Sequence, residues 1–274
     1  MSELSQEEII KYACGSGSVD TAGAITPGFR LILLDTATST NDIAKEELAS
    51  DHSSPVVVIA DTQTAGRGRL GRSFASPPGV GIYLSIGTCA PSGFEPGFFT
   101  MAAAVAVCRA IEKVCPCAEP PGIKWVNDIF MRGRKVCGIL AEAVPIPSGG
   151  FGGIITGIGI NCFPGSYPEE IAGIAGPVSE TIDSFSRNAL AGAVISELLG
   201  IMKDLEHFDP VRVVTDEYRR RCFIIGKKIA VISAEGTRPA TALAVCDNGG
   251  LEVEYRDDSS RAVLHSGEIS IRKI

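Results

Sequence analysis

The feature that most restricts the fold of this chain is the stretch QTAGRGRLGR at residues 63–72, which follows an apolar, strand-like run at residues 56–61. It contains the spacing G-x-G-x-x-G that links a strand to a helix in dinucleotide-binding folds. In those folds the helix begins within the glycines, but here SFASPPG follows, and this sequence cannot form a helix. A Walker phosphate loop is excluded too, because no Gly-Lys pair ends the motif. We therefore expect a flexible glycine loop.

The charge of this loop differs from that of the rest of the chain. Three arginines and no acid stand in residues 66–72, although the formal net charge of the whole chain is −7. Because arginine presents a planar set of donors to anions, the loop is suited to close over a small anionic ligand and exclude water. The alternative is a solvated basic loop.

Composition limits the class of protein. Hydrophobic residues make up 45% of the 274 residues and charged residues 21%, a balance that fills a globular core. The net charge argues against a general nucleic-acid binder, and a winged-helix DNA-binding domain needs more chain than precedes the first strand-like run. Residues 1–15 lack the features of a secretory signal, and the apolar run at 98–108 is too short to span a bilayer. We expect a cytoplasmic protein with no DNA or membrane partner.

Nine cysteines is an odd count, and without an export signal it predicts reduced thiols rather than disulfides. The three histidines are scattered and no C-x-x-C is present, so we expect no structural zinc site and assign no residue as a metal ligand.

Hydrophobic periodicity predicts an α+β architecture. Ser5 caps a short helix that ends before Gly15, and further helices are expected at about 40–50, 100–115, 186–207 and 210–221. Strands are expected at 30–35, 56–61, 80–89, 124–131, 136–143 and 154–162. Five shorter strands follow at 227–234, 240–247, 251–256, 262–266 and 268–273. The pattern predicts a mixed domain over residues 1–221 and a small β-barrel over residues 222–274.

Two further segments carry polar groups or glycines where a core strand would not. Residues 124–128, KWVND, place a cation, an indole, an amide and a carboxylate at one strand end, and the run at 134–140 returns beside them. Residues 157–161 put glycines inside an apolar strand, which indicates that something approaches the backbone closely. Taken singly, Trp125 is as well explained as a core residue, and Asn127-Asp128 as a turn.

Taken in order, these segments resemble the biotin protein ligases, also called biotin–acetyl-CoA-carboxylase ligases. The resemblance is strong over residues 31–162 and weaker in the C-terminal part, and it rests on residues 39–41, 63–72, 76–79, 124–128, 134–135, 138–140, 157–161 and 267–270. It implies a catalytic domain related to class II aminoacyl-tRNA synthetases, with a mixed sheet, and an SH3-like C-terminal barrel. It also implies ATP and Mg²⁺ as cofactors and a biotin carboxyl carrier protein as partner, and it leaves a homodimer open.

The resemblance also assigns residues. Arg67, Arg69 and Lys135 are the expected catalytic residues. The expected biotin site consists of Ser39, Thr40, Gln63, Gly66, Arg67, Lys135, Gly138 and Gly157. The expected ATP site consists of Arg69, Arg72, Phe74, Asn127, Asp128 and Arg272.

Elementary chemistry is consistent with these roles. A carboxylate must attack the α-phosphate of ATP to gain a leaving group, and cations such as Arg67, Arg69 and Lys135 offset the repulsion between the two anions. The ureido ring of biotin needs neutral donors and acceptors, which Thr40 and Gln63 carry. No protein nucleophile is required, since the carrier lysine attacks the mixed anhydride directly.

The chain departs from the family pattern at Val126 in place of proline, Leu70 in place of arginine, and Phe74 in place of the tryptophan that stacks on adenine. Phe74 keeps an aromatic face for stacking. Three alternatives stay open: a lipoate or octanoate ligase of the same fold, a biotin-responsive transcription repressor, and a non-catalytic adenylate-binding module.

Overall fold

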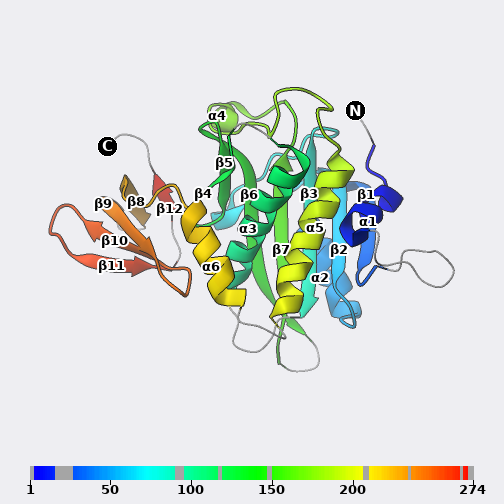
Figure 1. Ribbon diagram of the computed structural model, residues 1–274, viewed down its shortest axis with the longest axis horizontal. Helices are drawn as coiled ribbons and strands as arrows, with labels where there is room; N and C mark the ends of the chain where they lie inside the picture. The colour runs from blue at the N-terminus through cyan, green and yellow to red at the C-terminus, as the bar shows by residue number, and fades with distance from the viewer. Residues whose placement is uncertain are drawn as a thin grey trace.

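A computed structural model describes residues 3–15, 27–89, 96–116, 119–146, 150–205, 210–233, 236–265 and 268–270. Its centre is a seven-stranded mixed sheet in the order β1-β2-β3-β7-β6-β5-β4 (Figure 1). The first two strands are parallel and every other neighbouring pair is antiparallel. The strands are β1 Arg30–Ala37, β2 Val56–Gln63, β3 Gly81–Cys89, β4 Gly122–Lys124, β5 Asp128–Met131, β6 Arg134–Ile146 and β7 Gly150–Asn161.

Helices cover both faces of this sheet (Figure 1). Helices α3 (Pro96–Val114) and α5 (Arg187–Asp204) cover one face, α1 (Gln6–Cys14) packs on α5, and α6 (Pro210–Arg221) packs on α3 and β4. Helix α2 (Thr40–Ser50) covers the other face. In β2, Val57 and Ile59 join the core under α3, whereas Val56 and Val58 join the cluster under α2. Burial on both faces explains the unbroken apolar run of this strand.

Most of the predicted elements are confirmed, and so is the predicted cap at Ser5. Ser5 accepts a hydrogen bond from the Glu8 amide at the start of α1, and Ser186 caps α5 through the Ala189 amide. Among the described residues no helix is long and apolar enough to cross a membrane. The eight cysteines that the structure describes are free thiols.

The strand predicted at 124–131 is confirmed only in part, because residues 128–131 form β5 but residues 125–127 do not continue it. Residues 125–127 form a turn between β4 and β5, which pair antiparallel with Lys124 opposite Asp128. The apolar residues on both sides of the turn produce what looks like one strand in the sequence, but the chain reverses between them. The polar residues of KWVND therefore cluster at a hairpin tip.

The C-terminal residues form a second, five-stranded antiparallel sheet in the order β11-β10-β9-β8-β12 (Figure 1). Its strands are β8 Lys228–Ser233, β9 Gly236–Val245, β10 Leu251–Tyr255, β11 Arg261–Leu264 and β12 Glu268–Ser270. Buried residues of both sheets, such as Ile123 and Ile229, belong to one hydrophobic cluster. The domain boundary between residues 221 and 222 stays a prediction, with α6 ending at Arg221 and β8 beginning at Lys228.

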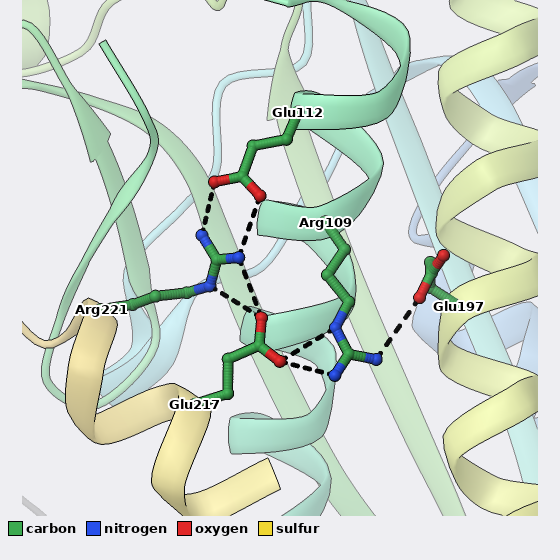
Figure 2. Close-up of polar contacts among 5 residues, drawn as sticks. All are labelled: Arg109, Glu112, Glu197, Glu217 and Arg221. Atoms are coloured by element: carbon green, nitrogen blue, oxygen red, sulfur yellow. Dashed lines mark hydrogen bonds and ion pairs between the residues drawn. The ribbon is translucent and has the colours of Figure 1, made fainter. Parts of the chain in front are cut away.

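Helices α3, α5 and α6 are joined by a group of five charged residues, which we call the helix network (Figure 2). Glu217 of α6 accepts hydrogen bonds from Arg109 of α3 and from Arg221. Arg221 binds both carboxylate oxygens of Glu112 at 2.7 and 2.9 Å, and Arg109 reaches Glu197 of α5 at 3.5 Å. The network therefore fixes the position of α6 against the rest of the protein.

Candidate functional site

Two adjoining cavities lie where the glycine loop, the 125–127 turn and strands β6 and β7 meet. The small cavity has a volume of about 50 Å³ and the large cavity about 260 Å³. The residues that line both cavities are Gly68, Arg69, Phe74, Asn127 and Lys135. The two spaces therefore share a wall, and this wall carries two of the three expected catalytic cations.

The small cavity holds most of the residues expected to bind biotin. The residues Ser39, Thr40, Gln63, Arg67, Lys135, Gly138 and Gly157 all line it. The Gln63 carboxamide oxygen accepts hydrogen bonds from the Thr40 amide at 2.9 Å and the Thr40 hydroxyl at 3.1 Å, and its nitrogen donates to Ser76 at 2.9 Å. The Gln63 orientation is thus fixed by both neighbours. Ser39 begins α2 without using its side chain as a cap.

Gly66 lies outside the lining of both cavities. A Cβ at this position would come within 2.5 Å of the Phe74 carbonyl oxygen and 2.9 Å of the Ser76 hydroxyl. Its backbone oxygen accepts a hydrogen bond from the Phe74 amide at 2.8 Å. Residue 66 must be glycine for the two ends of the loop, at Gly66 and Phe74, to pair this closely. Gly66 therefore shapes the site.

The glycine loop is cross-linked by its own backbone. The Gly68 amide donates to the Arg72 carbonyl at 2.6 Å, and Arg67 and Ser73 form an isolated bridge. At the tip, Leu70 has φ 56° and its side chain is 71% exposed. A leucine with positive φ is strained, and such strain often marks a functional loop.

Side chains of the protein itself approach the glycines of β6 and β7. A Cβ at Gly157 would collide with Asn41, and a Cβ at Gly159 would collide with the Phe74 ring. The Phe74 ring also lies over Gly138 and makes an edge contact with Tyr83, with the ring centroids 6.3 Å apart. The predicted close approach is confirmed, and in this structure Phe74 and Asn41 make it.

Each expected catalytic cation has a specific partner. Arg67 contacts Asp42 at 2.7 Å and Glu142 at 3.0 Å. Lys135 contacts Asp128 at 2.6 Å, and Arg69 donates to the Asn127 side-chain oxygen at 3.2 Å. These contacts hold the cations at the cavity walls.

Sequence reasoning missed the groups that orient Arg67. The Glu142 carboxylate, which binds Arg67, also accepts a hydrogen bond from Asn41 at 2.7 Å. Ser85 donates to the Asn41 oxygen at 2.6 Å. The sequence of β6 could have indicated Glu142, because it is an acid within an apolar strand. Side chains alternate along a strand, so Glu142 lies on the same face as Gly138.

The large cavity holds most of the residues expected to bind ATP. Arg69, Arg72, Phe74, Asn127 and Asp128 line it, and Arg272 lies outside the described residues. The cavity is also bounded by Trp125, Tyr167, Ile171, Ile174 and, from the second sheet, Ile269.

The sequence analysis did not single out the segment after β7 that carries three of these residues. It is bonded directly to the site, because the Lys135 amide donates to the Ile174 carbonyl at 2.8 Å and the Gly176 amide donates to the Lys135 carbonyl at 3.0 Å. Burial raises the pKa of Tyr167, so its hydroxyl stays protonated and this residue adds no charge to the cavity wall. The mixture of apolar wall and cationic border suits a ligand with a flat ring and an anionic group.

Comparison with known proteins gives a consistent result. The sequence model described as the Biotin/lipoate A/B protein ligase family matches residues 33–161. The bifunctional ligase/repressor BirA of Bacillus subtilis is 31% identical over 254 residues, which are 89% of this chain and 74% of that protein. The biotin–acetyl-CoA-carboxylase ligase of Mycobacterium tuberculosis is 31% identical over 73% of each chain. A structure of the Aquifex aeolicus biotin protein ligase in complex with biotin and ATP superposes with a TM-score of 0.72 at 26% identity, covering 89% of this chain and 99% of that one.

Proposed function

The chain belongs to the biotin/lipoate A/B protein ligase family, and we propose that it is a biotin protein ligase that activates biotin with ATP and transfers it to a lysine of a carrier protein. The observation that carries this proposal is the shared wall of the two cavities. A two-substrate adenylation needs the carboxylate of one ligand to meet the α-phosphate of the other, and adjoining cavities with cations at their junction provide such a meeting point.

In the first step a biotin carboxylate oxygen attacks the α-phosphorus of ATP, and the bond from that phosphorus to the bridging oxygen of pyrophosphate breaks. Biotin occupies the small cavity, with its ureido ring on Thr40 and Gln63, and ATP occupies the large cavity. Arg69 and Lys135 line both cavities, so their charges lie where negative charge accumulates. Arg67, oriented by Asp42 and Glu142, adds positive charge on the biotin side.

The small cavity must widen to admit biotin, because about 50 Å³ is well below the volume of a typical ligand pocket. The Phe74 ring covers Gly138 and Gly159 and borders both cavities, so its movement toward the large cavity would provide that space. There the ring would face the nucleotide base, which retains the stacking role predicted for it.

Magnesium enters this proposal as part of MgATP. Among the described residues no group of three or more His, Cys, Asp or Glu side chains is placed to hold a metal ion. Mg²⁺ is commonly bound by substrate phosphates together with one or two carboxylates. Asp128, in the wall of the large cavity, is the carboxylate expected to contribute, and Mg²⁺ would screen the charge of the pyrophosphate.

In the second step the amine of a carrier lysine attacks the acyl carbon of biotinyl-AMP and AMP leaves. The chain's contribution is to hold the anhydride and keep water away until the lysine arrives. The proposal includes the carrier protein as acceptor, a cytoplasmic location and a homodimer.

A lipoate ligase is the second candidate, since the family includes both activities. The fixed carboxamide of Gln63 favours biotin, because its hydrogen bonds match a polar ureido ring better than an apolar dithiolane ring.

An ATP–pyrophosphate exchange assay with biotin and with lipoate tests the proposal. We expect exchange that depends on biotin and MgATP, followed by transfer of biotin to a carrier domain. Exchange with lipoate alone would contradict it.

A further inference from the structure

The turn at residues 125–127 is the part of the site with the most connections. Asn127 lines both cavities, and its side-chain oxygen accepts the hydrogen bond from Arg69. Its side-chain nitrogen donates to the Ile139 carbonyl at 2.9 Å, and its backbone carbonyl accepts from the Ile139 amide at 2.9 Å. A displacement of this turn would therefore move Asn127 and Arg69 together.

Two groups from outside the central sheet hold the turn. The Trp125 indole donates at 2.9 Å to the carbonyl of Gly249, which lies in the turn between β9 and β10 of the second sheet. The Tyr218 hydroxyl of α6 donates to the Val126 carbonyl at 2.9 Å, and this tyrosine is completely buried. The buried Tyr218 hydroxyl has a restricted geometry, since it cannot turn to water when the Val126 carbonyl shifts.

Tyr218 itself is held in place by its neighbours on α6. Glu217 and Arg221 belong to the helix network that ties α6 to α3 and α5 (Figure 2). Arg219 donates to the Val245 carbonyl at 2.7 Å, which attaches the same turn of helix to the second sheet. These contacts hold the Tyr218 side chain in place, and its hydroxyl in turn holds the 125–127 turn.

We propose that Tyr218 is a positioning residue for the nucleotide half of the site, and that it acts through the Val126 carbonyl on Asn127 and Arg69. The proposal rests on the proposed function above for its substrates. It assigns α6 a role in nucleotide use, although Tyr218 lines neither cavity.

The state of the hydroxyl is consistent with this role. Burial raises the pKa of Tyr218 well above its usual value, with Asp128 adding to the rise and Arg69 opposing it. The hydroxyl therefore keeps its proton at working pH and donates to Val126 throughout.

Tyr218→Phe is the decisive variant, since it removes one hydroxyl and keeps the ring. We expect the KM for ATP in pyrophosphate exchange to rise about tenfold, while the KM for biotin changes by less than about twofold. We also expect faster amide hydrogen exchange at Ile139, whose N–H is bonded to the Asn127 carbonyl.

Two controls on the same helix separate positioning from stability. Thr215 is buried and its hydroxyl has no hydrogen-bond partner among the residues that the structure describes, so Thr215→Val should leave both KM values unchanged. Val214→Ala removes buried methyl groups and should lower stability without raising the KM for ATP.

The role of Tyr218 is overturned if the Tyr218→Phe enzyme keeps the wild-type KM for ATP, if the KM for biotin rises equally, or if Val214→Ala gives the same change. A wild-type protein that shows no biotin-dependent exchange would instead refute the proposed function. In that case amide hydrogen exchange at Ile139 in the Tyr218→Phe protein still tests whether Tyr218 holds the turn. An unchanged exchange rate would contradict this role, and a faster rate would agree with it.

Discussion

The helix network and the site use the same residue types in different ways. In the network Glu217 is 12% exposed and Arg221 17% exposed, and each guanidinium meets two carboxylates. At the site the Arg67 side chain is 43% exposed and its partner Asp42 50%. Arg69 donates to the neutral amide of Asn127. The charged groups of the helix network pair with one another, whereas the cations of the site border open cavities.

This difference shows how a structural cation is told from one that serves a ligand. A buried guanidinium with its donors matched to carboxylates stabilises the packing of helices, and removing one partner leaves an uncompensated charge. A half-exposed cation at a cavity wall contributes little to folding and much to binding an anion. The comparison makes each class of residue testable by separate measurements of stability and activity.

The largest effect is expected for Lys135→Ala. The rate of pyrophosphate exchange should fall by about 10²- to 10³-fold, because a charge at the α-phosphate is lost. The free energy of unfolding should fall by only about 1 kcal/mol, since the pair with Asp128 is partly exposed. Urea unfolding and exchange kinetics measure the two, with Lys113→Ala on exposed α3 surface as control. Near-normal turnover in a folded Lys135→Ala enzyme would place Lys135 with the structural cations.

Glu217→Gln in the helix network should show the opposite pattern, with a loss of stability of about 2 kcal/mol at pH 7. Burial opposes ionisation of Glu217, but hydrogen bonds from Arg109 and Arg221 outweigh it and lower its pKa below the usual 4.5. A lowered pKa stabilises the folded state above the unfolded value, and this contribution disappears as pH falls through the folded value. The urea midpoints of the two proteins should therefore differ at pH 7 and converge as the pH is lowered from 4.5 through the folded value, and a difference that stays constant with pH would exclude the charge as the cause.

Arg69→Gly should loosen the glycine loop and raise the rate of biotinyl-AMP release about tenfold, with biotinylation of bystander lysines. Rapid filtration measures the release, and mass spectrometry of an added inert protein detects the labelling. Limited proteolysis adds a test on the wild-type chain, in which biotin with ATP should slow cleavage after Arg69 or Arg72. Equal cleavage with and without ligands, together with unchanged release, would show that the loop is not a lid.

The smallest expected effect concerns DNA, for which we predict no sequence-specific binding at physiological salt. The net charge is −7, and Arg67 is already held by Asp42 and Glu142. A gel-shift assay with random and genomic fragments checks this, and a sequence-selective, salt-resistant shift would contradict it.

Site residues that lie in short sequence motifs were predicted better than residues that reach the site only through the folding of the chain. Thr40 and Gln63 were assigned to one site from motif order, and they are hydrogen-bonded across 23 positions of chain. The turn at 125–127 was considered only as an alternative, at Asn127-Asp128, because the apolar residues on both sides of it suggest one continuous strand. Tyr167 and Ile174 carry no local signal, since they lie in loops on either side of the short helix α4 (Glu169–Ala172) and reach the cavity only in the folded chain.

The shared wall also bears on inhibition. A single molecule that fills both cavities holds its second half at a high local concentration once the first is bound, so its affinity can exceed either half alone by orders of magnitude. The linker between its two halves should occupy the place where the biotin carboxyl group meets the α-phosphate, beside Arg69 and Lys135. It should also resist hydrolysis there. In the large cavity such a molecule would also contact Leu70 at the loop tip and the Phe74 ring.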